Sequence, residues 1–132
     1  MENFTISHPI IQNAITDLNI LLSDCKENIK SISLFGSTMK LIPVEDAKDI
    51  DFLIDYEGSY EELKTKIESV NIGRNVVIQH IKMGYANCPT WEKENPLRIH
   101  ILFYEKGKTI LSPKAVETEK YAFDITDNVL RK

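Results

Sequence analysis

Hydrophobic residues near the start of the chain recur at the spacing of an amphipathic helix. They are Ile11, Ala14, Ile15, Leu18, Leu21, Leu22, Cys25 and Ile29. The preceding Ser7-His8-Pro9 offers a capping side chain and a proline for the first turn, so the pattern predicts a helix over about residues 8–27. A short alternating run over residues 31–35 then meets Gly36, which predicts a strand that ends in a tight turn.

A stricter alternation follows over residues 49–56 and predicts a second strand with two different faces. One face carries Asp49, Asp51, Leu53 and Asp55, and the other carries Ile50, Phe52, Ile54 and Tyr56. The strand therefore has one apolar face and one face that bears three carboxylates.

Helix and strand patterns continue to alternate after the second strand. The Ser59 hydroxyl can accept from the amide of Glu62, and this capping box precedes an apolar stripe, which predicts a helix over about residues 60–70. Residues 76–81 are rich in β-branched side chains and predict a third strand, and residues 97–104 predict a fourth.

The last part of the chain gives a weaker pattern. Ser112-Pro113 can open a helix, whereas the tail from Asp124 onward fits no single element. No internal repeat or low-complexity segment interrupts the chain. We therefore expect one α/β (α+β) domain over residues 1–132, with a small mixed sheet flanked by helices.

Composition places the chain among ordinary soluble globular domains, with 132 residues of which 42% are hydrophobic and 27% charged. No apolar run reaches the roughly 18 residues of a membrane span, and the amino terminus lacks the features of a signal peptide. A cytoplasmic protein without a membrane partner is expected. Cys25 and Cys88 match no C-x-x-C spacing and are expected to be reduced thiols.

The charge balance disfavours a plain nucleic-acid binder. The formal net charge is −4, and no block of five or six like charges occurs, so tight nonspecific binding to duplex DNA is not expected. The cations are scattered, as at Lys40, Lys48, Arg74 and Lys82. Such scattered cations can still hold one triphosphate.

The candidate chemistry lies in the segment that joins the first two strands. Gly36 and Ser37 follow the first strand, and after an eleven-residue spacer Asp49 and Asp51 open the second. Two carboxylates at i and i+2 on a strand point to the same face and can bind one Mg²⁺ ion, which prefers oxygen ligands. Gly36 allows close approach of a phosphate, and Ser37 can donate hydrogen bonds to its oxygens.

This arrangement resembles the nucleotidyltransferase fold of the DNA polymerase β superfamily. The resemblance covers about residues 30–56 and rests on Leu34-Phe35-Gly36-Ser37, the spacer and Asp49-Ile50-Asp51. It implies the family's compact core, with Gly36 and Ser37 on the triphosphate of an NTP and both aspartates on Mg²⁺ or Mn²⁺.

The resemblance departs from the family at the third carboxylate, which active members carry on a later strand. The matching position here is His100, which can accept a proton from a nucleophile, bind a softer metal, or simply be a strand histidine. Asp124 is a less favoured substitute. Asp55 is expected to be exposed to solvent, and His80 is expected at the edge of the sheet.

Two functions remain open on the sequence. The first is a metal-dependent nucleotidyltransferase, in which Asp49, Asp51 and His100 move a nucleoside monophosphate from an NTP such as ATP to an acceptor hydroxyl on a protein, an RNA or a small molecule. The alternative is a catalytically inactive module of the same fold that binds nucleotide or a protein partner. Tyr85 and Trp91 can stack on a base, or else cover an edge of the core.

Overall fold

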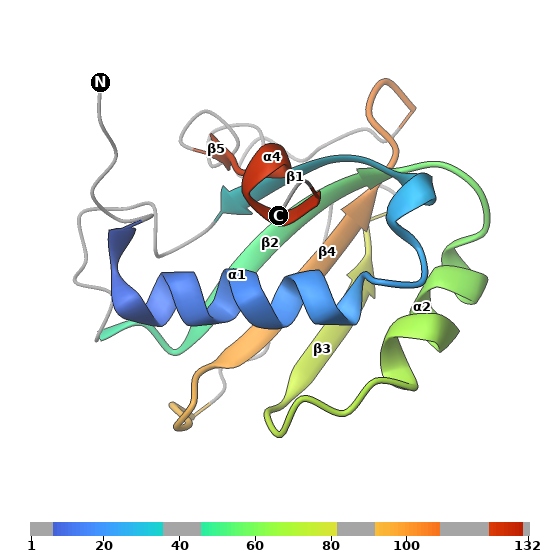
Figure 1. Ribbon diagram of the computed structural model, residues 1–132. Helices are drawn as coiled ribbons and strands as arrows, with labels where there is room; N and C mark the ends of the chain where they lie inside the picture. Colours follow the sequence, from blue (N-terminus) through green and yellow to red (C-terminus); the bar gives the residue numbers. More distant parts are fainter. Residues whose placement is uncertain (1–6, 36–45, 82–91, 109–121, 131–132) are drawn as a thin grey trace.

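A computed structural model describes residues 7–35, 46–81, 92–108 and 122–130. These residues form an α/β fold around one mixed five-stranded sheet, with three α-helices in the described part of the chain (Figure 1). The elements in chain order are α1 (Pro9–Leu21), the 3₁₀ turn η2 (Lys26–Asn28), β1 (Ile29–Phe35), β2 (Asp49–Tyr56), α2 (Tyr60–Glu68), β3 (Val76–His80), β4 (Arg98–Tyr104), β5 (Phe123–Asp124) and α4 (Thr126–Leu130).

The strand order is β3-β4-β2-β1-β5, so β4 lies between two strands that precede it in the chain. β1 pairs antiparallel with β2 and with β5, whereas β4 pairs parallel with both β2 and β3. A parallel pair needs a long connection, which α2, β3 and the following segment provide between β2 and β4. All seven residues of β4 are buried, as befits a strand inside the sheet.

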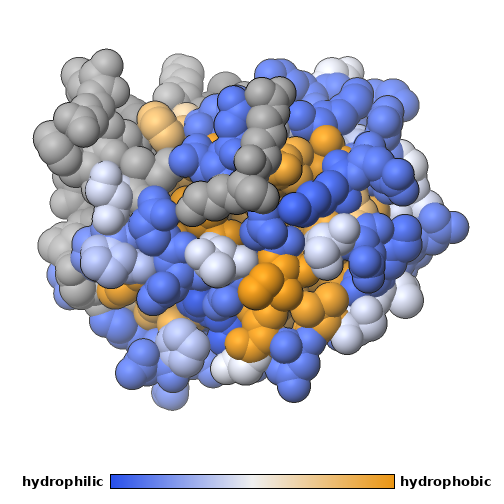
Figure 2. Space-filling model, viewed as in Figure 1, coloured by the Kyte–Doolittle hydropathy of each residue, from blue (hydrophilic) through white to orange (hydrophobic). Residues whose placement is uncertain are grey.

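The three helices cover one face of the sheet, as Figure 1 shows with α1 and α4 in front of the strands and α2 beside them. The apolar face of β2 packs there, as its alternation predicts, together with the inward faces of α1 and α2. The fully buried residues of this core with the largest side chains are Phe52, Phe103, Ile11, Ile15, Leu18, Leu21, Leu22, Ile32, Leu34, Ile50, Ile54 and Leu63. In the same view, Figure 2 shows mainly hydrophilic side chains on the outer surface, with an apolar patch near the space between α1 and α2.

The opposite face of the sheet has a smaller apolar centre. It consists of Leu53, Ile81, Leu102 and Tyr104, with Phe35 packed against them. Asp49 and Asp51 belong to this second face, because they alternate with the core residues of β2.

The first helix is shorter than its periodicity predicts. His8 caps it by accepting a hydrogen bond from the Ile10 amide, and Pro9 occupies the first turn. The helix ends at Leu21 instead of about residue 27, because the chain must reverse before β1 begins at Ile29. A turn and η2 make that reversal, while the side chain of Cys25 stays buried in the core.

The other elements lie within two residues of their predicted bounds where the structure describes them. Ser59 caps α2 through the Glu62 amide at 3.3 Å, which confirms half of the capping box. In the ambiguous tail, β5 and α4 form, and Asp124 accepts from the amide of Thr126 at the start of α4. The helix predicted to begin at Ser112-Pro113 lies outside the described residues.

Candidate metal centre

One group of metal-capable side chains stands out in the part of the chain that the structure describes. Carboxylate oxygens of Asp49 and Asp51 and a ring nitrogen of His100 all lie within 4.8 Å of one another. The two aspartates are half-buried and His100 is only 1% exposed. We call these three residues the Asp-Asp-His cluster.

Strand pairing explains why residues so far apart in the sequence meet. In the parallel β2–β4 register, Asp51 lies opposite His100, and Asp49 lies opposite Arg98. Side chains at opposite positions of paired strands lie on the same face, and alternation places Asp49 beside Asp51 on that face. The predicted pairing of the two carboxylates is thus found, and His100 joins them.

Both ring nitrogens of His100 contact protein oxygens. Nδ1 lies 2.8 Å from Oδ1 of Asp51, and Nε2 lies 2.7 Å from Oε1 of Gln79. Sequence reasoning missed Gln79, because a single polar residue on a β-branched strand carries no spacing that marks it. Only the β3–β4 pairing shows that this residue reaches His100, from a position diagonal to it on the neighbouring strand.

The electrostatics of the cluster centre on Asp49. Burial, and next the nearby charge of Asp51, raise the pKa of Asp49 from 3.8 to about 6, although His100 and Arg98 act in the opposite direction. The guanidinium of Arg98 is itself held by Glu94, with an N···O distance of 2.8 Å. The site therefore disfavours the negative charge of Asp49, and a bound cation would offset this cost.

Gly36 and Ser37 lie outside the described residues, so their predicted contact with a phosphate stays a prediction. The last described residue of β1, Phe35, pairs with Asp51. Tyr85 and Trp91, the candidates for base stacking, also lie outside the described residues.

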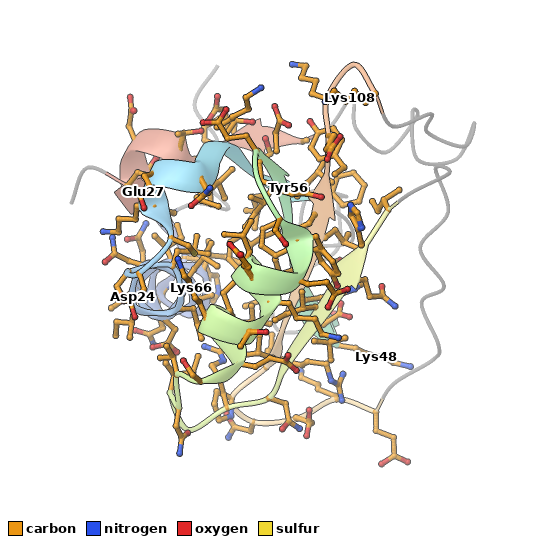
Figure 3. All side chains as sticks on the ribbon, turned by 90° about the vertical axis from the view of Figure 1, so that its right-hand side faces the viewer. Asp24, Glu27, Lys48, Tyr56, Lys66 and Lys108 are labelled. Atoms are coloured by element: carbon orange, nitrogen blue, oxygen red, sulfur yellow. The ribbon has the colours of Figure 1, made fainter. Side chains whose placement is uncertain are left out.

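Two of the scattered cations have different surroundings. The exposed Lys48 directly precedes Asp49, and Figure 3 shows its side chain extending away from the ribbon on the side opposite α1. Arg74 instead donates to the carbonyl of Leu97 and pairs with Asp17 at 3.1 Å, with only 3% of its side chain exposed. Arg74 therefore ties α1 to the β-strand region, and Lys48 is the cation better placed for a ligand.

Asp55 and Asp124 make structural contacts away from the cluster. The expectation that Asp55 is exposed was wrong, because Asp55 is 7% exposed and accepts a hydrogen bond from the Lys106 amide at 3.0 Å. Its carboxylate satisfies a backbone donor just after β4, which explains its burial. Asp124 is on β5, which β1 separates from β2, and its carboxylate accepts from the Thr126 amide instead of joining the cluster.

His80 ends the edge strand β3, as predicted. Its ring packs against Tyr56, the last residue of β2, and Tyr60, the first residue of α2. Its Nε2 lies 2.7 Å from the Tyr56 hydroxyl, and Tyr60 stacks on its ring at a centroid distance of 4.3 Å. Burial, followed by the nearby Glu105, raises the pKa of Tyr56 to about 12. This aromatic group joins α2 to the sheet.

The donor set of the Asp-Asp-His cluster fits a divalent metal ion. Two ligands of one Mg²⁺ ion lie at most about 4.2 Å apart, so the present spread of the ligand atoms requires only a small side-chain adjustment. Carboxylate oxygens suit Mg²⁺ and Mn²⁺, and an imidazole nitrogen suits transition metals. Asp49, Asp51 and His100 are thus the residues that can hold an ion.

Comparisons with family models, curated proteins and solved structures found no match to this chain. None of the helices in the described ranges combines the length and the apolar composition that a bilayer crossing requires. The chemistry of the cluster must therefore be inferred from its own residues.

Proposed function

We propose that the protein is a metal-dependent nucleotidyltransferase that transfers a nucleoside monophosphate from an NTP to an acceptor hydroxyl and releases pyrophosphate. One observation carries the proposal. The two aspartates of β2 share a face with each other and with His100, at the position where β1 ends. Together with the Gly36-Ser37 motif, the two aspartates match two of the three carboxylates expected of such an enzyme, and His100 is at the position of the third.

The aspartates have the clearest role in this proposal. Phosphoryl transfer requires positioning and charge neutralisation, and a bound divalent ion supplies the second of these. Asp49 and Asp51 would hold the ion, because both carboxylates face the same space and neither is fully exposed. Gly36 and Ser37 would hold the triphosphate, with the exposed Lys48 as an additional cation.

His100 fits a positioning or ligand role better than that of a mobile base. Its ring is 1% exposed, and both nitrogens lie within 2.8 Å of protein oxygens. A general base must reach the acceptor proton directly or through one water molecule. We therefore assign His100 to orienting Asp51 and contributing to the ion, and its assistance at the acceptor stays a prediction from the sequence.

A second candidate function is the inactive module that binds nucleotide or a partner. The observation that favours it is the same buried His100, which replaces the third carboxylate with a side chain already engaged by Asp51 and Gln79. Two-metal catalysis depends on ligands for both ions, and the described cluster offers one set.

A binding test examines what the two candidates share. Mg²⁺ with ATP should raise the melting temperature more than either alone, because both bind the folded state and the ion completes its shell with phosphate oxygens. Asp51→Asn should abolish this gain. Asp24→Asn is the matched control, since Asp24 is exposed in the turn after α1 and lies near Lys66 in Figure 3.

A transfer test separates the enzyme from the module. Labelled ATP, GTP, CTP and UTP are incubated with the protein in Mg²⁺ and in Mn²⁺ and offered protein and RNA acceptors. We expect transfer by the wild type and none by Asp51→Asn. A nucleotide-dependent shift without any transfer would support the module that binds nucleotide. No shift in the wild type would contradict the enzyme and would leave only a module that binds a protein partner.

A further inference from the structure

The Asp-Asp-His cluster contains a nitrogen ligand that a pure magnesium site lacks. Mg²⁺ binds few nitrogen ligands and usually keeps several waters beside one or two carboxylates. Imidazole is a common ligand of first-row transition metals, whose affinity for nitrogen donors exceeds that of Mg²⁺. The identity of residue 100 therefore bears on which ion the cluster selects.

Gln79 sets the orientation of the imidazole. An amide oxygen only accepts hydrogen bonds, so Nε2 of His100 is the donor in the contact at 2.7 Å. Metal-binding histidines typically donate their second ring N–H to an oxygen in this way, which directs the other nitrogen to the ion. In the neutral ring, Nδ1 then presents its lone pair to the carboxylate of Asp51.

The contact between His100 and Asp51 requires a proton or a metal ion that both atoms bind. Nδ1 and Oδ1 lie 2.8 Å apart, and two lone pairs do not face each other at this distance without a proton or a cation between them. Neighbouring ligands of a metal ion with bonds of about 2.1 Å lie about 3 Å apart. The separation of the two atoms therefore already suits a shared metal ion, and the imidazole turns toward an ion that lies beside the line between them.

Burial adds to this preorganisation. His100 is 1% exposed and Asp51 has 13% of its side chain exposed, so the packing of β4 within the sheet already restricts the imidazole to few orientations. Little side-chain freedom remains to be lost when an ion binds. The nitrogen ligand thus stabilises a complex with a suitable ion at low entropic cost.

We propose that the Asp-Asp-His cluster selects a first-row transition-metal ion such as Mn²⁺ over Mg²⁺, with Gln79 as the positioning residue of His100. The inference rests on the proposed function only in placing a metal ion at this cluster. It does not require that a nucleotide binds or that any group is transferred.

The test uses metal ions alone. Binding of Mn²⁺ to the metal-stripped protein is followed by loss of the free-ion signal in electron paramagnetic resonance, and Mg²⁺ is then added as competitor. Half-displacement of Mn²⁺ should require at least about tenfold more Mg²⁺, because the imidazole favours only the transition metal. This competition needs no variant, so it does not depend on the folding of a mutant.

Two variants then assign the selectivity to residues. Gln79→Ala should weaken Mn²⁺ binding about 10–100-fold while changing Mg²⁺ binding little, as expected when the partner of a histidine ligand is lost. His100→Asp should shift the preference toward Mg²⁺ by replacing nitrogen with oxygen. Gln12→Ala on α1 and His8→Asp at its cap are the matched controls, because α1 covers the other face of the sheet.

The possible results distinguish failure of the metal selectivity from failure of the proposed function. Equal affinities for Mn²⁺ and Mg²⁺ in the wild type, or unchanged Mn²⁺ binding in folded Gln79→Ala, would overturn the selectivity even if nucleotidyl transfer occurs. Failure of Mn²⁺ to bind would also overturn it. Selective Mn²⁺ binding without any response to nucleotides would support the selectivity and count against the proposed function.

Discussion

Replacing Asp49 by asparagine should make the protein more stable at neutral pH. The carboxyl group of Asp49 is half-buried and lies close to the carboxylate of Asp51, and burial, then this neighbour, raise its pKa to about 6. Asparagine keeps the shape of the side chain and removes the charge. The substitution therefore relieves the cost of ionising this group in the folded protein.

The size of the effect follows from proton linkage. The pKa of Asp49 is 3.8 when unperturbed and about 6 in the fold. Each pKa unit corresponds to about 1.4 kcal/mol, and screening by solvent at a half-buried site reduces the product, so we expect Asp49→Asn to add about 1–3 kcal/mol at pH 7.5. For a domain of this length, that corresponds to a rise of about 3–10 °C in melting temperature.

The sign of the pH dependence is also fixed. Between about pH 4 and 6 the folded wild type binds more protons at Asp49 than the unfolded chain does, so its stability falls as the pH rises through this window. The advantage of Asp49→Asn should therefore be largest above pH 6 and disappear as the pH falls to about 4.

Urea unfolding in EDTA, followed by circular dichroism from pH 4 to pH 8, measures this difference. Asp46→Asn is the matched control, since Asp46 is exposed just before β2. Asp51→Ala should have the opposite effect and cost about 1–3 kcal/mol, because it leaves the buried His100 without its carboxylate partner. A lower stability of Asp49→Asn at pH 7.5, or a difference from wild type that does not change with pH, would refute the reasoning.

Three further predictions concern the core and the tail. Phe103→Ala should destabilise the fold by about 3–5 kcal/mol in urea unfolding, because this fully buried ring also contacts Tyr56 and Tyr60. Asp124→Ala should cost about 1 kcal/mol by removing the acceptor of the Thr126 amide and hydroxyl at the start of α4, with the exposed Asp46→Ala as the comparison. The Cys25 thiol should resist iodoacetamide at pH 8 until the protein is unfolded, because burial raises its pKa, and peptide mass spectrometry reads its labelling.

The alternation of β2 could be predicted from the sequence almost residue by residue. One face of Asp49–Tyr56 packs in the core and the other carries the carboxylates, as a period of two requires. The end of α1 could not be placed in the same way, because apolar residues keep their helical spacing through the turn that leads to β1. Tertiary packing, which needs Cys25 in the core at that turn, decided where the helix stops.

The candidate site could likewise be predicted only where its residues follow a local sequence pattern. The aspartates were found from their spacing, and His100 from its apolar flanks on a predicted strand. Gln79 and the burial of Asp55 depend on which strands become neighbours, and a single sequence does not state that β4 inserts between β2 and β3. No local sequence pattern therefore predicts the contacts that form when β4 pairs with β2 and β3.

The insertion of β4 has a consequence for the newly made chain. Synthesis proceeds from the amino terminus, so β2 and β3 leave the ribosome before β4, and each then has an open edge that only β4 fills. Open edges invite pairing with other chains, and charged residues on a strand oppose such pairing. The carboxylates of Asp49 and Asp51 are on one of these edges, where their repulsion protects the unfinished sheet until His100 arrives beside them.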